Sequence, residues 1–259
     1  MVFGTWGTTS YYHLLIDLII PLWITRRHLQ ETLGILDDEA AISYHRVSTH
    51  GFEGELSSAN AIFEHFMGAP IEDTLEGRFE HLVYGFFYNH RPYHGPYRPT
   101  VMSADYRRRL AEFRTQFCQF SASGRPEFLV PTRSDRLSPF VDRFISKHGA
   151  RFHFTEIDFG KLSVAEQISA CGRADGIFGN EGAAFSNQVF LPSGSIVIPV
   201  AEEPERFEFH EPLAAYMDHT FLAVHPDDEA ASERQVIEAL NAHQSASAAG
   251  GCHGTSRAV

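Results

Sequence analysis

Apolar residues recur at helical spacing near the start of the chain. Their stripe predicts a helix from about Tyr11 to Leu33 with one face on a core, formed by Leu14, Leu15, Leu18, Ile19, Leu22 and Trp23. Pro21 lies inside this segment and predicts a kink or an internal boundary. Further on, the pattern predicts short strands at 41–47 and 81–87, a helix at 59–67, and a helix at 103–120 with Ser103 as its N-cap.

The pattern becomes regular after residue 126. Apolar runs predict strands at 127–131, 151–157, 175–178, 195–200 and 220–224, alternating with helices at 138–148, 163–171, 182–190 and 228–243. Ser163 and Glu166 have the spacing of a capping box, which marks the start of one helix. This alternation predicts an α/β fold with a parallel sheet covered by helices.

The segment "SASGRP" at 121–126 separates these two patterns and predicts a domain boundary. We expect an N-terminal domain at 1–122 and a C-terminal domain at 123–225. A helix at 226–243 then follows, and the low-complexity tail at 244–259 is expected to be disordered.

Charge and cysteine content narrow the classes of protein. With 33 acidic and 21 basic residues among 259, the net charge of −12 argues against a nucleic-acid surface. Three widely spaced cysteines predict neither a disulfide framework nor a zinc site, and they suggest a reducing, cytoplasmic setting. The apolar run at 14–24 is shorter than a membrane span and lacks the features of a signal peptide.

The stretch "DGIFGNEGAAFSN" reads as a strand, a glycine turn and a helix start. In a parallel α/β sheet such turns lie where ligands gather, and backbone amides at the helix start favour an anion. Gly179 and Gly182 would let the backbone approach that ligand. The alternative is that both are ordinary turn glycines and that Asn187 is a polar surface residue.

Other side chains suggest how such a ligand would be held and used. Arg133 and Arg136 follow a predicted strand and can each grip two phosphate oxygens, unless they are solvated surface arginines. His13 and Asp17 share one helical face and could supply a general base, or they could form a structural pair. We expect no metal, since the chain has neither an H-E-x-x-H nor an Asp-x-Asp pattern.

The block from residue 163 to residue 200 resembles glycosyltransferase family 61. The family pairs an "eQ" helix with a strand, a "GxHGAxxxN" turn and a "PGSxVIEI"-like strand. The matching residues here are Glu166, Gln167, Ala174, Asp175, Gly179, Gly182, Ala183, Asn187, Phe190, Pro192 and Gly194. The segments "YYHLLIDLIIPLW", "FEHLVYGFF" and "EFLVPTRSDR" are similar to further family segments, so the resemblance covers about residues 10–225.

The resemblance implies a metal-independent GT-B enzyme, with two Rossmann-like lobes facing a cleft, which inverts the sugar during transfer. The donor would be a nucleotide sugar, a UDP-sugar by analogy, and the acceptor a hydroxyl of a glycan or protein, with no further cofactor. The candidate donor-binding residues are Arg133, Arg136, Gln167, Gly179, Glu181, Gly182, Ala183 and Asn187. The candidate catalytic residues are His13 and Asp17.

Two positions depart from the family pattern. Glu181 stands where the family usually has histidine, and "LSPFVDR" replaces an Arg-x-x-x-Asn-Glu run. A carboxylate repels phosphate unless it faces ribose hydroxyls or a cation neutralises it. The alternative to an enzyme is therefore a non-catalytic nucleotide-sugar binder or structural protein with the same fold. A hydrolase has little support, because the chain has no G-x-S-x-G turn.

Overall fold

The computed structural model describes the larger part of the chain. The described residues are 2–3, 11, 13–33, 44–46, 56–72, 84–85, 104–120, 126–132, 138–203, 207 and 210–249. The chain divides into two compact units, Met1–Gln116 and Phe117–Val259. Among the described residues, no helix combines the length and the hydrophobicity that a bilayer span requires.

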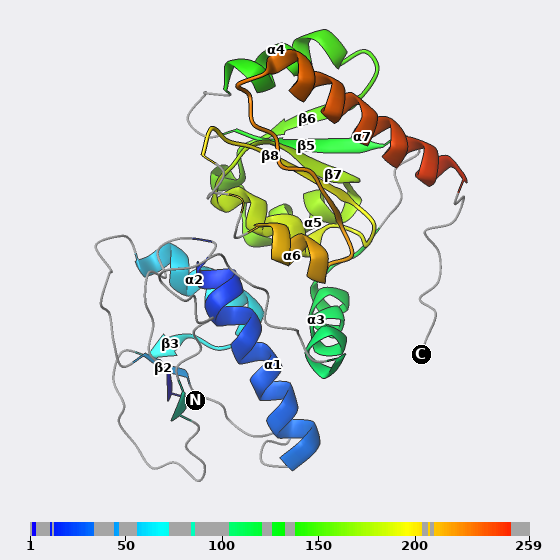
Figure 1. Ribbon diagram of the computed structural model, residues 1–259. Coiled ribbons are helices and arrows are strands. Elements are labelled where there is room, and N and C mark those ends of the chain that lie inside the picture. Colours follow the sequence, from blue (N-terminus) through cyan, green and yellow to red (C-terminus); the bar gives the residue numbers. More distant parts are fainter. Residues whose placement is uncertain are drawn as a thin grey trace. The chain divides into compact units, whose positions relative to one another are not determined.

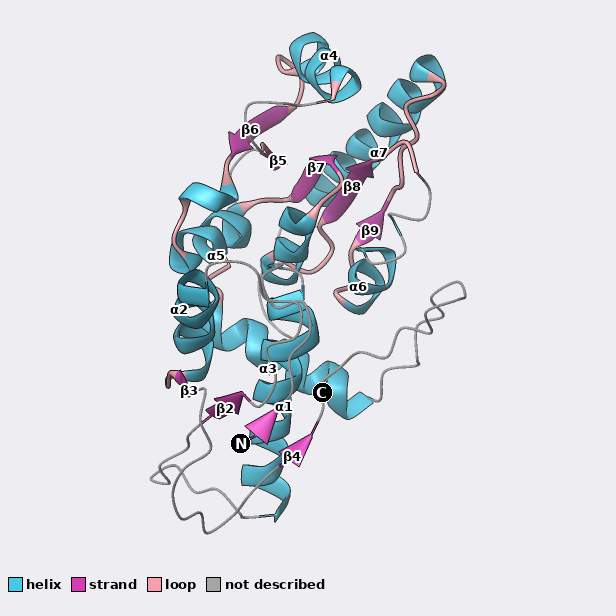
Figure 2. Ribbon diagram, turned by 90° about the vertical axis from the view of Figure 1, so that its left-hand side faces the viewer, coloured by secondary structure: helices cyan, strands magenta, loops and turns pink. Residues whose placement is uncertain are grey.

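The first unit contains short parallel strands and apolar helices. Its elements are β1 (Val2–Phe3), η1 (His13–Ile19), α1 (Ile20–His28), η2 (Leu29–Leu33), β2 (Tyr44–Arg46), α2 (Leu56–Met67), β3 (Ile71–Glu72), β4 (Tyr84–Gly85) and α3 (Ala104–Phe117). The described strands pair in the order β3-β2-β1-β4, and each pair is parallel (Figure 2). The predicted strands at 41–47 and 81–87 and helices at 59–67 and 103–120 thus correspond to β2, β4, α2 and α3.

The predicted N-terminal helix is present but changes type along its length. The segment His13–Ile19 is a π-helix, and the α-helix begins at Ile20, directly before Pro21. Proline has no N–H to donate to the preceding turn, so a change of hydrogen-bond pattern at this point is expected. The boundary predicted from Pro21 is therefore confirmed.

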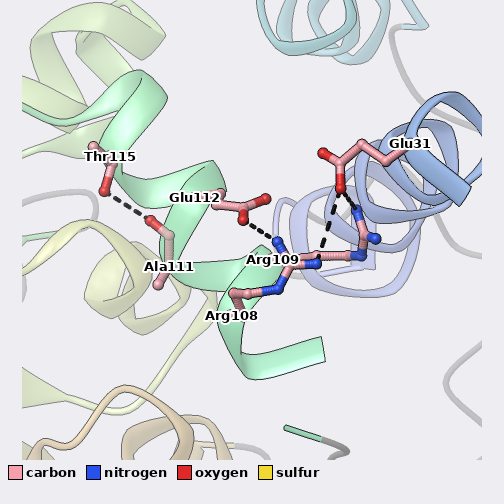
Figure 3. Close-up of polar contacts among 6 residues, drawn as sticks. All are labelled: Glu31, Arg108, Arg109, Ala111, Glu112 and Thr115. Carbon is pink, nitrogen blue, oxygen red and sulfur yellow. Dashed lines mark hydrogen bonds and ion pairs between the residues drawn. The ribbon is translucent and has the colours of Figure 1, made fainter. Parts of the chain in front are cut away.

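Aromatic contacts and ion pairs attach α3 to the rest of the first unit. The ring of Phe113 lies 5.5 Å from the rings of both Trp23 and Phe66. Arg109 is buried and donates to the Glu31 carboxylate at 3.1 Å (Figure 3). The guanidinium of Arg108 lies near the same carboxylate, at 3.9 Å. Two arginines of α3 thus form ion pairs within the first unit.

The second unit is built on a five-stranded parallel sheet. Its elements are β5 (Glu127–Pro131), α4 (Pro139–His148), β6 (His153–Ile157), η3 (Phe159–Lys161), α5 (Val164–Arg173), β7 (Gly176–Asn180), η4 (Ala183–Phe190), β8 (Ile196–Val200), α6 (His210–Tyr216), β9 (Thr220–Phe221) and α7 (Glu229–Ala249). The described strands follow the order β6-β5-β7-β8-β9, and every pair is parallel (Figure 2). The predicted α/β fold with a parallel sheet is confirmed for this unit.

Helices cover both faces of this sheet. In Figure 1, α4 and α7 lie over one face, while α5 and α6 lie over the other. The core between the sheet and the first pair of helices is aromatic and aliphatic, and it includes Phe128, Phe144, Phe178, Val236 and Leu240. Polar contacts join the same two helices at their surface, where Glu233 of α7 accepts from both Lys147 and His148 of α4.

Three elements of the second unit differ from the sequence-based expectation. The segment predicted as a helix at 182–190 is a 3-10 helix, η4. The helix α6 was not predicted, because Glu211 and Pro212 interrupt any apolar stripe; proline is nevertheless tolerated in a first helical turn. The last helix continues to Ala249, so disorder from residue 244 onward is a wrong expectation for 244–249, where alanines favour helix.

Candidate functional site

The carboxyl ends of β5, β7 and β8 meet at one edge of the sheet, because these strands are neighbours and parallel. The N-terminal end of α4 is attached to this edge. The backbone N–H of Ser138, the N-cap of α4, donates to Asn180 Oδ1 at 3.1 Å. The Ser138 hydroxyl in turn accepts from the N–H of Val141. The turn after β7 and the start of α4 are therefore held together.

Glycine stands at two positions near the turn after β7, and the structural reason differs between them. Gly179 has a φ of +155°, and a Cβ there would lie 3.4 Å from Pro131 Cδ. This contact distance is an ordinary one, so the backbone conformation, which residues with a Cβ rarely adopt, is what favours glycine here. Gly182 has an extended backbone, and a Cβ on it would meet no atom of the described residues within 4 Å. The packing of the described residues therefore does not explain Gly182, and it leaves room for a ligand at this point.

Glu181 lies between these glycines and contacts a histidine from a distant part of the chain. Its carboxylate Oε1 lies 3.0 Å from Nε2 of His210, the first residue of α6. The two side chains are 12% and 3% exposed. A carboxylate can only accept hydrogen bonds, so the Nε2–H of His210 is the donor in this contact. Glu181 thus stands where the family usually has histidine, and its carboxylate contacts a histidine from another element, His210.

Gln167 and Asn187 form a buried amide pair below the turn. Gln167 Nε2 donates to the carbonyl oxygens of Phe159, at 3.0 Å, and Leu162, at 3.2 Å. Its Oε1 accepts from Asn187 Nδ2 at 3.3 Å. Both residues are nearly inaccessible, since Gln167 is 7% exposed and Asn187 is 0% exposed. In this structure the pair therefore joins α5 to η4, and a direct contact with a donor stays a prediction.

The 3-10 helix η4 buries polar side chains on its inner face. Ser186 and Gln188 are each 0% exposed. Among the described residues, neither the Ser186 hydroxyl nor either end of the Gln188 amide has a hydrogen-bond partner. The backbone carbonyl of Gln188 accepts from His219 Nε2 at 2.9 Å. Ala183, the first residue of η4, is exposed next to Gly182.

The side chains of four predicted site residues lie outside the described part of the structure. Arg133 and Arg136 lie outside the described residues, between Thr132 and Ser138. His13 and Asp17 lie in η1, but their side chains are outside the description. The structure thus brings together Gly179, Glu181, Gly182, Ala183, Gln167 and Asn187 around the turn after β7 and the start of η4.

Sequence reasoning missed His210. Its contact with Glu181 joins a turn and a helix that are 29 residues apart. Neither periodicity nor a short motif reports a contact over such a distance. The ring of Phe185 also packs near that of His210, with 5.5 Å between the two ring centres.

Comparison with known proteins agrees with the resemblance noted in the sequence. Residues 136–198 match the family model described as Glycosyltransferase 61. The matched segment runs from the loop before α4 through η4 and into β8, so it includes the turn with Glu181 and the buried amide pair. No curated protein matches the chain.

Proposed function

We propose that the chain is an inverting glycosyltransferase that takes a sugar from a nucleotide-sugar donor and transfers it to a hydroxyl acceptor. The observation that carries the proposal is the match of residues 136–198 to Glycosyltransferase 61. This segment contains the turn after β7 and the start of α4, which share the ligand-binding edge typical of parallel α/β sheets.

The donor in this proposal is a UDP-sugar bound in the second unit. Gly182 provides the close approach, since a Cβ there would meet no described atom. Arg133 and Arg136 follow β5 in the sequence and would grip the diphosphate. Gln167 and Asn187 would support the turn from below by the hydrogen bond that joins them. The donor binds without a metal ion in this scheme, and no further cofactor takes part.

The chemistry in this proposal is a single displacement. The acceptor oxygen forms a bond to the anomeric carbon, the bond from that carbon to the nucleotide phosphate breaks, and the acceptor proton passes to a base. His13 and Asp17 would supply the base, by resemblance to the family's N-terminal segment. The GT-B arrangement, with acceptor recognition by the first unit, belongs to the same proposal.

A non-catalytic nucleotide-sugar binder is the second candidate. It is favoured by two departures from the family pattern, the carboxylate of Glu181 in place of histidine and "LSPFVDR" in place of the Arg-x-x-x-Asn-Glu run. Such a protein would keep the donor-binding turn but transfer no sugar.

Measurements on the wild type separate the two candidates, and one variant tests the proposed base. Asp17→Asn keeps size and hydrogen bonding but removes basicity, so transfer should fall by about 100-fold or more while UDP affinity barely changes. Turnover with UDP-sugars, UDP affinity by calorimetry and melting temperature are measured on the wild type and the variant. A wild-type protein that binds UDP but transfers no sugar is the binder. Unchanged turnover in Asp17→Asn removes this residue from the mechanism.

A further inference from the structure

The contact between Glu181 and His210 fixes a carboxylate at the ligand-binding edge of the sheet. The Glu181 backbone N–H donates to the carbonyl of Val200 at 2.9 Å, which holds the residue against the end of β8. The His210 N–H holds the side chain, at 3.0 Å. A glutamate side chain has several rotatable bonds, and a contact at each end leaves its carboxylate one main orientation.

The chemistry of a fixed carboxylate determines which part of a nucleotide it can accept. It accepts hydrogen bonds and carries negative charge, so it attracts hydroxyl groups and repels phosphate oxygens. A carboxylate has about four acceptor sites, so it can accept from an imidazole and from hydroxyl groups at the same time. In dinucleotide-binding parallel sheets an acidic residue at the carboxyl edge binds a ribose hydroxyl.

Neighbouring groups make this place accessible to a ligand. The Glu181 side chain is 12% exposed, whereas that of His210 is 3% exposed. Gly182 follows directly and leaves the space beside its backbone empty of described atoms. Glu181 thus keeps some exposed surface while His210 holds it, at the strand end where the proposed donor lies.

We propose that Glu181 binds the ribose diol of the nucleotide and that His210 is the positioning residue that orients its carboxylate. The inference rests on the proposed donor site and deepens it by naming the group of the donor that Glu181 selects. It also explains how a carboxylate is accommodated where the family usually has histidine. The imidazole comes from α6 instead of from the turn, and the carboxylate meets hydroxyls rather than phosphate.

The test compares UDP with 2′,3′-dideoxy-UDP, which differs only in lacking the diol. The full-length protein should bind UDP at least tenfold more tightly, because hydrogen bonds to a charged acceptor are among the stronger ones. In Glu181→Ala the two affinities should come within about twofold of each other. A general loss of folding would weaken both nucleotides and leave their ratio unchanged.

Two amide variants test the positioning role of His210. In His210→Gln the longer side chain can place an N–H where Nε2 now lies, so the preference for UDP should be retained. In His210→Asn the amide is one methylene shorter and does not reach, so the preference should shrink towards that of Glu181→Ala. The matched control is His148→Asn, which removes the similar 2.8 Å contact with Glu233 between α4 and α7 and should leave the ratio unchanged.

The outcomes separate this inference from the proposed function. If the wild type binds both nucleotides equally, the diol assignment is wrong while the donor site stands. If Glu181→Ala loses the preference and a folded His210→Asn keeps it, His210 has no positioning role. If the wild type binds neither nucleotide, the donor-site proposal fails and this inference fails with it.

Discussion

At the residue scale, the two glycines of the turn after β7 should respond in opposite ways to alanine. Gly179→Ala puts a residue with a Cβ at a φ of +155°, which such residues rarely adopt, so the free energy of unfolding should fall. We expect a loss of about 1 kcal/mol or more. Gly182→Ala meets no described atom and should leave stability unchanged, but it should weaken UDP binding. Urea unfolding and UDP calorimetry on both variants measure this; strong UDP binding by Gly182→Ala would contradict a ligand at that position.

Two buried glutamines provide a second comparison at the same scale. Gln167→Met removes three hydrogen bonds, to Phe159, Leu162 and Asn187, and should cost about 2 kcal/mol or more of unfolding free energy. Gln188 is equally buried, but its amide has no partner among the described residues. Gln188→Met should therefore be neutral or stabilise the protein by roughly 1 kcal/mol. Chemical denaturation checks both; a large loss in Gln188→Met would show that this amide is satisfied in solution.

The residue scale also shows where sequence reasoning ends. The motif identified Glu181, Gly182 and Asn187, because local spacing along one turn carries that information. It could not show that His210 contacts Glu181, since this partner comes from another element. Residues set by a turn are thus predictable from sequence, and residues set by packing between elements are not.

At the scale of elements, the pairing of α4 with α7 should depend on pH. The hydrogen bonds from Lys147 and then from His148 lower the pKa of Glu233 below its usual value of 4.5. A carboxyl group with a depressed folded-state pKa stabilises the fold above its unfolded pKa, and this contribution is lost as pH falls through the folded pKa. Stability should therefore decrease below about pH 4.5.

Glu233→Gln tests this contribution. The variant should be less stable than the wild type near neutral pH, and the difference should shrink in acid. Glu238→Gln, at an exposed position on the same helix, is the control. Unfolding by urea at a series of pH values gives both curves. A difference between wild type and Glu233→Gln that stays constant down to pH 3 would contradict the assignment.

Element boundaries could be predicted where an apolar run or a capping motif marks them in the sequence. The strand Glu127–Pro131 and the capping box of Ser163 and Glu166 agree with the pattern, because an apolar run or a cap specifies each locally. The π-helical form of η1 and the 3-10 form of η4 were not predictable. Apolar spacing along the sequence predicts a helix in both segments, but it does not distinguish these hydrogen-bond patterns from that of an α-helix.

At the scale of the whole molecule, the two units differ in the length of most of their described strands. The second unit has five parallel strands and contains the segment that matches Glycosyltransferase 61. The first unit pairs short strands of two or three described residues, and its proposed catalytic side chains lie outside the description. The contacts around the proposed donor turn thus lie in the second unit, and the proposed acceptor role of the first unit follows from the resemblance to glycosyltransferase family 61.

The most direct test of the central claim is hydrogen exchange of the full-length protein with and without saturating UDP, in the presence of EDTA. We predict slower exchange in peptides covering 179–187 and the start of α4 at 138–141. The amides of α7 at 229–249 should be unaffected, because, among the described residues, the first turns of that helix form ion pairs with α4 and not with the turn after β7. Unchanged exchange throughout residues 126–203 would contradict a nucleotide-sugar donor site in this unit.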